Sequence, residues 1–307
     1  MLRFDYDSLA VLAAVVREGS FEAAAKSINV TQSAISQRIR QLEEKVGAVL
    51  IARGRPCVPT DAGLQLCRHV EQVALLQQEL GERMSALVGG GEATAATIRI
   101  AVNNDSLATW FPNVIKRATQ ELGIRVDILP DDQEHTEDRL KSGEALAVVT
   151  SLETPVQGCR RISLGSMDYI AVAAPELFRT KFVRGVSLDT LRGSTCLAFN
   201  RKDTIQAQWM TLCFGEAVPL STHFVPSYEG YISCCLNGTA WGLVPRTERI
   251  TKLISLGALL ELSPGMAVKI SLHWQASNQP SDILNRLGDI VREEARESLS
   301  PDRFRPT

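Results

Sequence analysis

Polar side chains recur along one face of residues 31–46, and their types suit hydrogen bonding to the edges of DNA bases. They are Thr31, Gln32, Ser33, Ser36, Gln37 and Arg40. Glutamine and arginine can make paired hydrogen bonds to bases in the major groove, and hydroxyl groups reach bases or phosphates. No carboxylate occurs between Thr31 and Gln41, although the whole chain has more Asp+Glu (35) than Lys+Arg (33). The face therefore predicts DNA contact, with the ordinary solvated face of a small helical bundle as the alternative.

Two short helices joined by a tight turn are predicted to position that face. Asn29 and Val30 form the turn, and Thr31 is a suitable N-cap for the second helix. Each helix has an apolar stripe at helical spacing. The stripes are Phe21, Ala24, Ala25 and Ile28 in the first helix, and Ile35, Ile39, Leu42 and Val46 in the second. This is the arrangement of a helix-turn-helix, in which the N-terminal part of the second helix reads the bases.

Residues on both sides are predicted to complete a winged helix-turn-helix domain over residues 1–60. A first helix is expected at 5–18, and a two-stranded wing at 49–52 and 57–59. Arg53 and Arg55 lie on the wing loop, where they are well placed to meet phosphates or a minor groove. A solvated hairpin tip is the alternative for them. The charge distribution supports DNA contact, because residues 1–60 hold eight Lys+Arg against six Asp+Glu, whereas the whole chain has a net charge of −2.

About the first sixty-five residues closely resemble, without a gap, the N-terminal signature of LysR-type transcriptional regulators. The matching positions are Leu9, Leu12, Val15, Gly19-Ser20-Phe21, Ala24-Ala25, Thr31-Gln32-Ser33-Ala34-Ile35-Ser36, Ile39, Leu42-Glu43, Gly47, Leu50-Ile51, Arg53, Thr60 and Gly63. Leu12 and Ile51 stand where many members have phenylalanine, and both replacements stay apolar. The resemblance implies a transcriptional regulator that binds double-stranded DNA, with RNA polymerase as a further partner to expect.

Residues 61–91 are predicted to form a long linker helix followed by a glycine-rich hinge at 89–91. An apolar seam with one polar interruption follows heptad spacing along this helix. Its members are Leu66, Val70, Val73, Gln77, Leu80, Met84 and Leu87. A lone helix of this length must bury such a face, either against a second chain or against the chain's own body. The resemblance favours pairing with a second copy, and it implies a tetramer of two unequal dimers.

Residues 92–307 are predicted to form an effector-binding domain of two α/β lobes. In the first lobe, strands are expected at 97–102, 124–129 and 145–150, with helices at 106–122 and 137–142. A second series of strands and helices occupies 187–244, and a charged helix 280–298. Alternating units of this kind predict a largely parallel sheet. We place two crossings near 169–174 and 270–275, which gives lobe I about 97–168 and 275–300, and lobe II about 170–272. Two lobes with two crossings resemble periplasmic binding proteins, the architecture of the LysR-type effector domain.

A ligand site is predicted where the first strand of this domain meets the following helix. Ligands in α/β sheets bind beyond the carboxyl ends of the strands, where helix N-termini point. The segment there supplies Asn104, Asp105, Ser106, Thr109 and Trp110. The hydroxyl groups of Ser106 and Thr109, with backbone N–H groups, can hold a ligand carboxylate. Asp105 would either cap the helix or face an ammonium group.

Residues 101–110 also resemble the ArgP-type subgroup of the family, which controls the export of basic amino acids and was once described as inhibiting chromosome replication initiation. Further resemblance lies at Arg139-Leu140, Gly143-Glu144, Gly165, Asp168-Tyr169 and in 238–245. It implies lysine or arginine as effector, and a basic amino-acid exporter or related gene as target. The side-chain cation of such a ligand needs an anionic partner. The candidates are Asp132, Asp168 and Glu229, each with a helix cap or a surface charge as its alternative.

Other functional classes find less support in the sequence. No phosphate-binding loop, nucleophile elbow, dinucleotide fingerprint or metal-ligand pair is present, so we expect neither an enzyme nor a cofactor. A solute-binding protein would leave the first eighty residues unexplained. A thiol sensor using Cys196 and Cys213, or the adjacent Cys234 and Cys235, is a further alternative. The apolar run 9–16 is too short for a membrane span and lacks the flanks of a secretory signal, so we expect a cytoplasmic protein.

Overall fold

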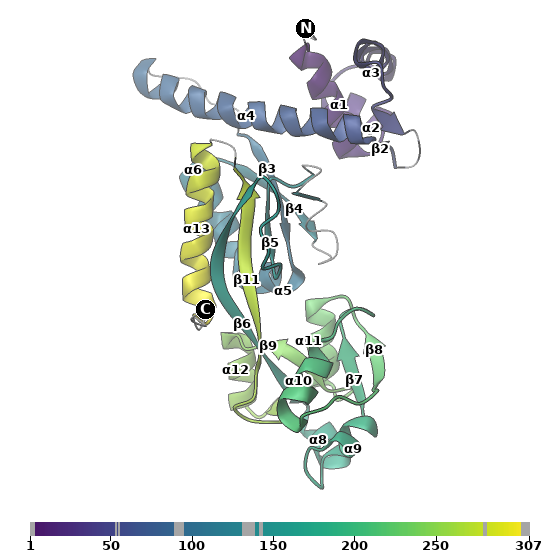
Figure 1. Cartoon of the computed structure of the whole chain (residues 1–307), viewed down its shortest axis with the longest axis vertical. Helices are drawn as coiled ribbons and strands as arrows, with labels where there is room; N and C mark the ends of the chain where they lie inside the picture. Colours follow the sequence, from purple (N-terminus) through teal and green to yellow (C-terminus); the bar gives the residue numbers. More distant parts are fainter. Residues whose placement is uncertain are drawn as a thin grey trace.

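The computed structural model describes residues 4–52, 54, 56–88, 95–130, 139–140, 144–278 and 281–301. Figure 1 shows an N-terminal helical head, a long helix α4 that crosses beneath it, and two α/β lobes stacked below α4. No helix among the described residues is long and apolar enough to cross a membrane.

The head consists of three helices and a small wing. The elements are α1 (Tyr6–Glu18), α2 (Phe21–Ser27), α3 (Gln32–Val46), β1 (Ile51–Ala52) and β2 (Val58–Pro59). Side chains cap all three helices at their N-termini, with Asp5, Ser20 and Thr31 accepting hydrogen bonds from the first turns. Asn29 has a φ of 54°, the left-handed conformation of a tight turn. The predicted helix-turn-helix is therefore confirmed.

The wing is held against the helices by groups that a short hairpin alone would lack. The Glu43 carboxylate accepts the backbone N–H of Leu50 at 2.8 Å. The Thr60 hydroxyl donates to the carbonyl of Val49 at 2.7 Å. Gly63 lies so close to this turn that a Cβ there would stand 2.1 Å from the carbonyl oxygen of Leu50. These contacts fix the wing base at the start of α4.

Helix α4 (Asp61–Val88) connects the head to the first lobe. Its first half packs on the head, where Cys67 is buried and Leu66 and Val70 are partly buried against the core formed by α1, α2 and α3. Its second half lies along the first lobe, where Leu75 joins that lobe's core. The hinge residues 89–91 lie outside the described residues.

Lobe I is built on parallel strands covered by helices. It contains β3 (Thr97–Val102), α5 (Asn104–Thr109), α6 (Phe111–Leu122), β4 (Arg125–Pro130), β5 (Ala147–Thr150) and the closing helix α13 (Asp282–Ser298). The prediction of one helix over 106–122 was wrong, because the chain breaks between α5 and α6 at Trp110. Pro112 in the first turn of α6 explains the break, since proline has no N–H to continue a helix. The helix predicted at 137–142 lies mostly outside the described residues.

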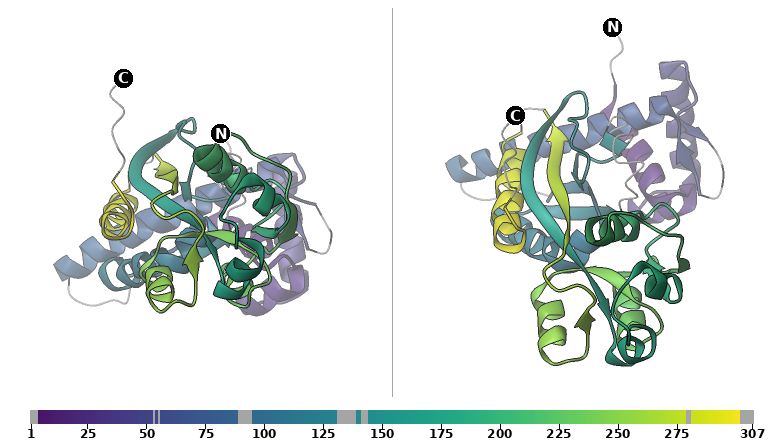
Figure 2. Two further views of the ribbon diagram at one scale, coloured as in Figure 1. Left: turned by 90° about the horizontal axis from the view of Figure 1, so that it is seen from below. Right: turned by 60° about the horizontal axis from the view of Figure 1, so that its bottom comes forward.

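Two long strands link the lobes. They are β6 (Cys159–Ala173) and β11 (Val268–Ser277), which pair antiparallel. These strands include the positions 169–174 and 270–275 where we placed the crossings, but β6 begins ten residues earlier than predicted. The largely parallel sheet was a wrong prediction: β3 pairs in parallel with β4 and β5, whereas β11 pairs antiparallel with β5 and β6. In both views of Figure 2, α13 lies beside β6 and β11.

Lobe II is assembled from the segment between the two crossing strands. It contains α8 (Pro175–Lys181), α9 (Leu188–Arg192), β7 (Thr195–Ala198), α10 (Ile205–Phe214), β8 (Ser221–Phe224), α11 (Tyr228–Leu236), β9 (Gly242–Pro245), α12 (Glu248–Ser255) and β10 (Leu260–Glu261). The parallel pair of β7 and β8 forms its own small sheet, and β9 pairs with β6. Helices α8 and α12 were not predicted.

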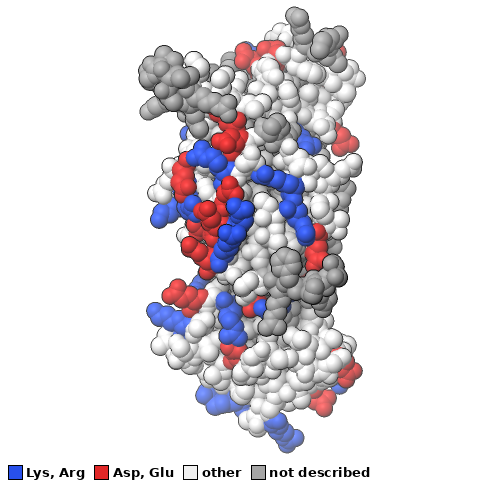
Figure 3. Space-filling view, turned by 60° about the vertical axis from the view of Figure 1, so that its left-hand side comes forward, with Lys and Arg blue, Asp and Glu red and all other residues white. Residues whose placement is uncertain are grey.

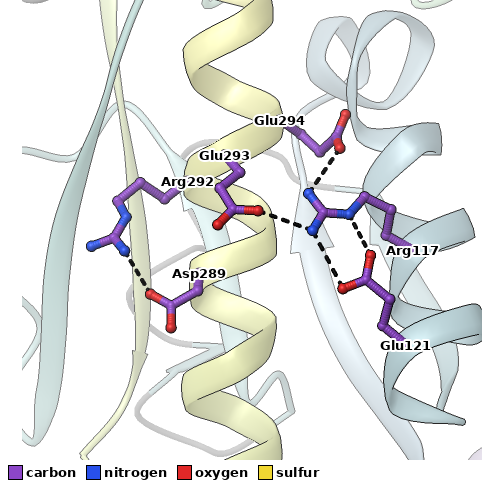
Figure 4. Close-up of polar contacts among 6 residues, drawn as sticks. All are labelled: Arg117, Glu121, Asp289, Arg292, Glu293 and Glu294. Carbon is purple, nitrogen blue, oxygen red and sulfur yellow. Dashed lines mark hydrogen bonds and ion pairs between the residues drawn. The ribbon is translucent and has the colours of Figure 1, made fainter.

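The outer face of lobe I carries acidic and basic side chains that neutralise one another. Figure 3 shows them interleaved over the side of the molecule that carries α6 and α13. Arg117 of α6 is the centre of this network and binds Glu121, Glu293 and Glu294 (Figure 4). Because its cation contacts three carboxylates, Arg117 fastens α6 to α13 on the outside of the lobe.

Candidate functional sites

The polar face of α3 is presented outward by the packing of the head. Ile35, Ile39 and Leu42 are buried against the head's core, so the opposite side of α3 faces solvent. Thr31, Gln32, Ser33, Gln37 and Arg40 are exposed, and Ser36 is partly exposed. The Thr31 hydroxyl caps the helix by accepting the N–H of Ala34 at 3.2 Å and lies 3.0 Å from the Ser33 hydroxyl. The helix thus offers a row of hydrogen-bonding groups that fits a DNA groove.

One further cation adjoins this face. Arg38 is exposed on α3 beside Gln37 and was not singled out by the sequence reasoning, although its position next to the polar face was visible in the sequence. The predicted phosphate-binding residues Arg53 and Arg55 lie outside the described residues.

A cavity of about 710 Å³ lies between the two lobes. Lobe I contributes residues that follow β3 and β5, and lobe II contributes residues that follow β7 and β8. The crossing strands supply Tyr169 and Ile270. These walls are the carboxyl ends of parallel strands, the usual ligand position in α/β folds. The volume falls within the range of small-molecule sites.

Asp105 is the acidic group that lobe I presents to this cavity. The Tyr169 hydroxyl donates to its Oδ2 at 2.5 Å. Burial raises the pKa of the Asp105 carboxyl; the Tyr169 hydrogen bond opposes this shift, whereas the negative charge of Asp203 adds to it. Burial also raises the pKa of Tyr169, so this phenol remains a neutral donor. A partly buried carboxylate beside a second acid favours a cationic ligand, because a cation would offset both the loss of hydration and the repulsion between the acids.

Asn103 adds a second acceptor beside Asp105. Its Oδ1 is buried and has no hydrogen-bond partner among the described residues, although Asn103 lines the cavity. Buried polar atoms are nearly always satisfied in native proteins. A ligand ammonium or guanidinium group would supply the missing donor.

The other residues predicted in this segment have different roles. Asn104 lines the cavity, as does Asp105. Ser106 is fully buried and is not part of the cavity wall. The Thr109 hydroxyl donates to the carbonyl of Asp105 at 2.6 Å, within the helix. Trp110 is buried in the core edge-on to Phe111. The interpretation of Ser106 and Thr109 as a carboxylate clamp therefore does not fit the geometry.

The predicted cation partners at other strand ends also lie elsewhere. Asp168 binds the ammonium group of Lys269 at 3.0 Å and accepts from the Ser300 hydroxyl at 3.1 Å. Glu229 forms a two-pronged ion pair with Arg249 on the surface of lobe II. Neither residue lines the cavity between the lobes. Asp132 lies outside the described residues.

Lobe II supplies cavity residues that the sequence reasoning missed. They are Asn200, Lys202, Asp203, Thr204, Gln208 and Tyr228. The Asp203 carboxylate is already bound by the backbone N–H groups of Phe199 and Ile205, which fixes the loop before α10. One compositional signal was available: the chain has only 4 tyrosines, and Tyr169, Tyr228 and Tyr231 line the cavity.

The cavity is thus polarised in a way that suits a ligand with two charged ends. Asp105 and the Asn103 carbonyl offer acceptors to a cation. The ammonium group of Lys202 and the side-chain amides of Asn104 and Asn200 offer donors to a carboxylate. A free amino acid with a basic side chain carries both kinds of group, and charge-assisted hydrogen bonds are the stronger ones.

The apolar seam of α4 divides into two parts. Leu66 and Val70 pack on the chain's own head, and Val73 is partly buried. Leu80 and Met84 are 60% and 48% exposed, and Leu76, outside the predicted seam, is 52% exposed. These three lie one turn apart on one side of the helix. The side chain of Leu87 is not described.

Five of the seven cysteines have a pKa raised above that of an ordinary thiol. Burial raises the pKa of Cys67 and of Cys235 to about 12. It also raises the pKa values of Cys159, Cys196 and Cys213. A sensing thiol needs a lowered pKa, so Cys196, Cys213 and Cys235 do not fit the thiol-sensor alternative. The described residues contain no cluster of three or more potential metal ligands.

Comparison with known families matches both parts of the chain. Residues 6–64 match the family described as "Bacterial regulatory helix-turn-helix protein, lysR family". Residues 91–296 match the family described as "LysR substrate binding domain".

Individual relatives match over nearly the full length. The HTH-type transcriptional regulator ArgP of Pseudomonas aeruginosa is 36% identical over 299 residues, which cover 97% of this chain and 98% of that protein. The crystal structure of ArgP from Mycobacterium tuberculosis has a TM-score of 0.78 at 36% identity and covers 98% of this chain and 100% of that one. Full-length LysG from Corynebacterium glutamicum with bound effector Arg has a TM-score of 0.69 at 32% identity, with 97% and 100% covered.

Proposed function

Because this chain belongs to the LysR family of bacterial transcriptional regulators, we propose that it binds DNA through α3 and that arginine or lysine, bound between the lobes, is its effector. One observation carries the choice of effector. A partly buried carboxylate, Asp105, faces the cavity between the lobes, and its hydrogen-bond donor among the described side chains is the neutral Tyr169 hydroxyl.

In this proposal, different side chains bind the two ends of the ligand. The guanidinium or ammonium group lies against Asp105 and the Asn103 carbonyl. The α-carboxylate lies toward Lys202, Asn104 and Asn200. Because these side chains belong to both lobes, a bound ligand draws lobe I and lobe II together. The Corynebacterium glutamicum relative that was solved with bound arginine supports this choice of ligand.

We also propose a separate role for each part of the chain. Residues 1–60 bind DNA, residues 61–91 pair two chains, and residues 92–307 bind the effector. The wing residues Arg53 and Arg55 contact the DNA backbone. The target is a basic amino-acid exporter or a related gene, and the regulator acts in the cytoplasm as a dimer or tetramer that meets RNA polymerase at the promoter. It has no catalytic role.

The cavity assignment is tested by calorimetric titration of the full-length protein. Wild type and Asp105→Asn are titrated with arginine, lysine and citrulline, which has the shape of arginine without its charge. A hydrogen bond to a charged group contributes about 1.5–3 kcal/mol, so Asp105→Asn should bind arginine and lysine at least about tenfold more weakly. Citrulline affinity should change little.

Glu229→Gln is the matched control, because it removes a lobe II carboxylate that lies outside the cavity. It should bind all three ligands as wild type does. Equal arginine affinity of wild type and Asp105→Asn would overturn the cavity assignment. Failure of the wild type to bind either basic amino acid would overturn the proposed effector.

A further inference from the structure

Helix α4 is fastened to lobe I of its own chain by a buried amide. Gln78 is only 5% exposed. Its Nε2 donates to the carbonyl of Leu122 at 3.0 Å, and its Oε1 accepts the backbone N–H of Ala96 at 2.6 Å. The amide therefore joins α4 both to the end of α6 and to the approach of β3. Figure 1 shows α4 lying across this end of the lobe.

The next residue makes a second attachment. The Glu79 carboxylate accepts from the Ser281 hydroxyl at 2.7 Å and from the N–H of Ile283 at 3.2 Å. Both donors belong to the start of α13. A carboxylate at a helix N-terminus is favourable because it complements the helix dipole.

A third group on α4 lies in the junction between the head and the lobe. Glu71 lines a cavity of about 420 Å³ formed by α1, α4 and the first residues of β3. Its side chain is 19% exposed, and its Oε2 has no hydrogen-bond partner among the described residues. Arg99 of β3 approaches its Oε1 at 3.8 Å, a long ion pair, while the Nε of Arg99 donates to Asp127 at 3.0 Å.

The charges around Glu71 come from every element of the junction. Arg17 projects from α1, Arg99 from β3 and Asp127 from β4, and Cys67 lies one turn earlier on α4. Burial raises the pKa of the Glu71 carboxyl to about 7; the attraction of Arg99 lowers it, and Asp127 raises it. Because burial dominates, the closed junction favours the protonated carboxyl.

We propose that Glu71 is a proton-sensitive positioning residue that loosens the attachment of α4 to lobe I as the pH rises through neutrality. When the junction opens, water hydrates the carboxylate, and its pKa returns toward the ordinary value of 4.5. The open form therefore releases the proton, and higher pH favours it. The attachment made by Gln78 and Glu79 weakens with it, because all three groups leave lobe I together.

The magnitude follows from proton linkage. With a pKa of about 7 when closed and 4.5 when open, the ratio of open to closed forms increases about tenfold between pH 6 and pH 8. This pH dependence is opposite to that of an ordinary salt bridge, which becomes more stabilising as its carboxylate ionises with rising pH. A pH-dependent increase in opening is therefore a specific signature of this junction.

Hydrogen exchange of the full-length protein tests the proposal at the amide of Ala96, whose N–H is held by Gln78. Exchange is measured at pH 6, 7 and 8 in wild type and Glu71→Gln, because the ratio of the two at each pH removes the intrinsic pH dependence of exchange. The exchange rate of wild type divided by that of Glu71→Gln should increase about tenfold from pH 6 to pH 8. A ratio that stays within twofold would overturn the proposal. Glu216→Gln, which removes an exposed carboxylate of lobe II, should match wild type throughout.

Arg99→Gln provides a second variant that keeps the titrating group. Removing this cation takes away the larger of the two attractions that lower the pKa of Glu71, so the transition should move to higher pH. A shift to lower pH, or none, would overturn the role of this junction. Melting curves of all variants establish that they are folded.

A functional readout rests on the proposed effector. With arginine saturating at both pH values, the change in operator affinity that it causes should differ between pH 6 and pH 8 in wild type and be the same at both in Glu71→Gln. If arginine does not bind at either pH, the proposed function fails, while the exchange result still decides the role of Glu71.

Discussion

Leu80 on α4 offers the sharpest test of how two chains associate. In the single chain its side chain is 60% exposed, and Leu76 and Met84, one turn to either side, are about half exposed. Three large apolar side chains in a row on one helix face are unusual for a solvated surface. We expect the same helix of a second copy to cover them. Leu80→Ser removes the central one.

The expected loss can be worked from the exposed fraction. Full burial of a leucine side chain stabilises by about 1.5–3 kcal/mol. The exposed 60% of Leu80 therefore contributes about 1–2 kcal/mol when a second chain covers it. A symmetric dimer contains the contact twice, so the loss is about 2–4 kcal/mol, or roughly 30- to 700-fold in the dimer dissociation constant.

Sedimentation velocity over a concentration series measures that constant. Leu256→Ser is the control, because Leu256 is 72% exposed at the end of α12 in lobe II, away from the seam. It should associate as wild type does. An unchanged dissociation constant for Leu80→Ser would refute the role of α4 in pairing the chains. Operator affinity should fall together with association, since two linked heads bind two half-sites more tightly than one.

Three further outcomes are expected. Gln37→Ala and Arg40→Ala should each weaken operator binding in gel shifts by about 1–3 kcal/mol without changing the melting temperature, and unchanged affinity of both would exclude this face as the reader. Arginine affinity should rise with pH as the Asp105 carboxyl, whose pKa burial raises, becomes ionised; calorimetry at several pH values checks the direction, and a decrease would contradict it. Gly63→Ala should lower the free energy of unfolding by about 1–3 kcal/mol, because its Cβ would collide with the carbonyl of Leu50, and an unchanged urea midpoint would show that the turn yields freely.

The head was predictable because its determinants are local. The N-cap at Thr31, the turn at Asn29 and the apolar stripe of α3 all lie within one short stretch of chain. Each is specified by neighbours in sequence, so pattern reasoning reaches the correct helices. The outward face of α3 follows directly from its buried face.

The cavity was only partly predictable because its walls are distant in sequence. Asp105 and Tyr169 are 64 residues apart and meet through the pairing of long strands. The prediction that Ser106 binds ligand at the strand-to-helix junction failed because α5 begins at Asn104, so Ser106 lies within the helix and its side chain is buried. Asp168 pairs with Lys269 and Glu229 pairs with Arg249, and both partners are too distant in sequence for a local pattern to reveal.

The junction between α4 and lobe I was invisible in the sequence for a related reason. Gln78 interrupts no apolar pattern, and Gln77 is the residue that occupies the predicted seam. The structure buries Gln78 and leaves Gln77 exposed, because the helix turns its side toward lobe I in this half. A heptad pattern predicts one buried face, whereas α4 has two: one packs on its own chain, and the other carries the exposed apolar row.

The central claim, that a basic amino acid lies between the lobes with its cation on lobe I, is tested most directly by a crystal structure of the protein grown with arginine. We expect density for arginine in the cavity, with the guanidinium within hydrogen-bond distance of the Asp105 carboxylate and the α-carboxylate toward Lys202. Arginine bound with its carboxylate against Asp105, or bound outside this cavity, would contradict it.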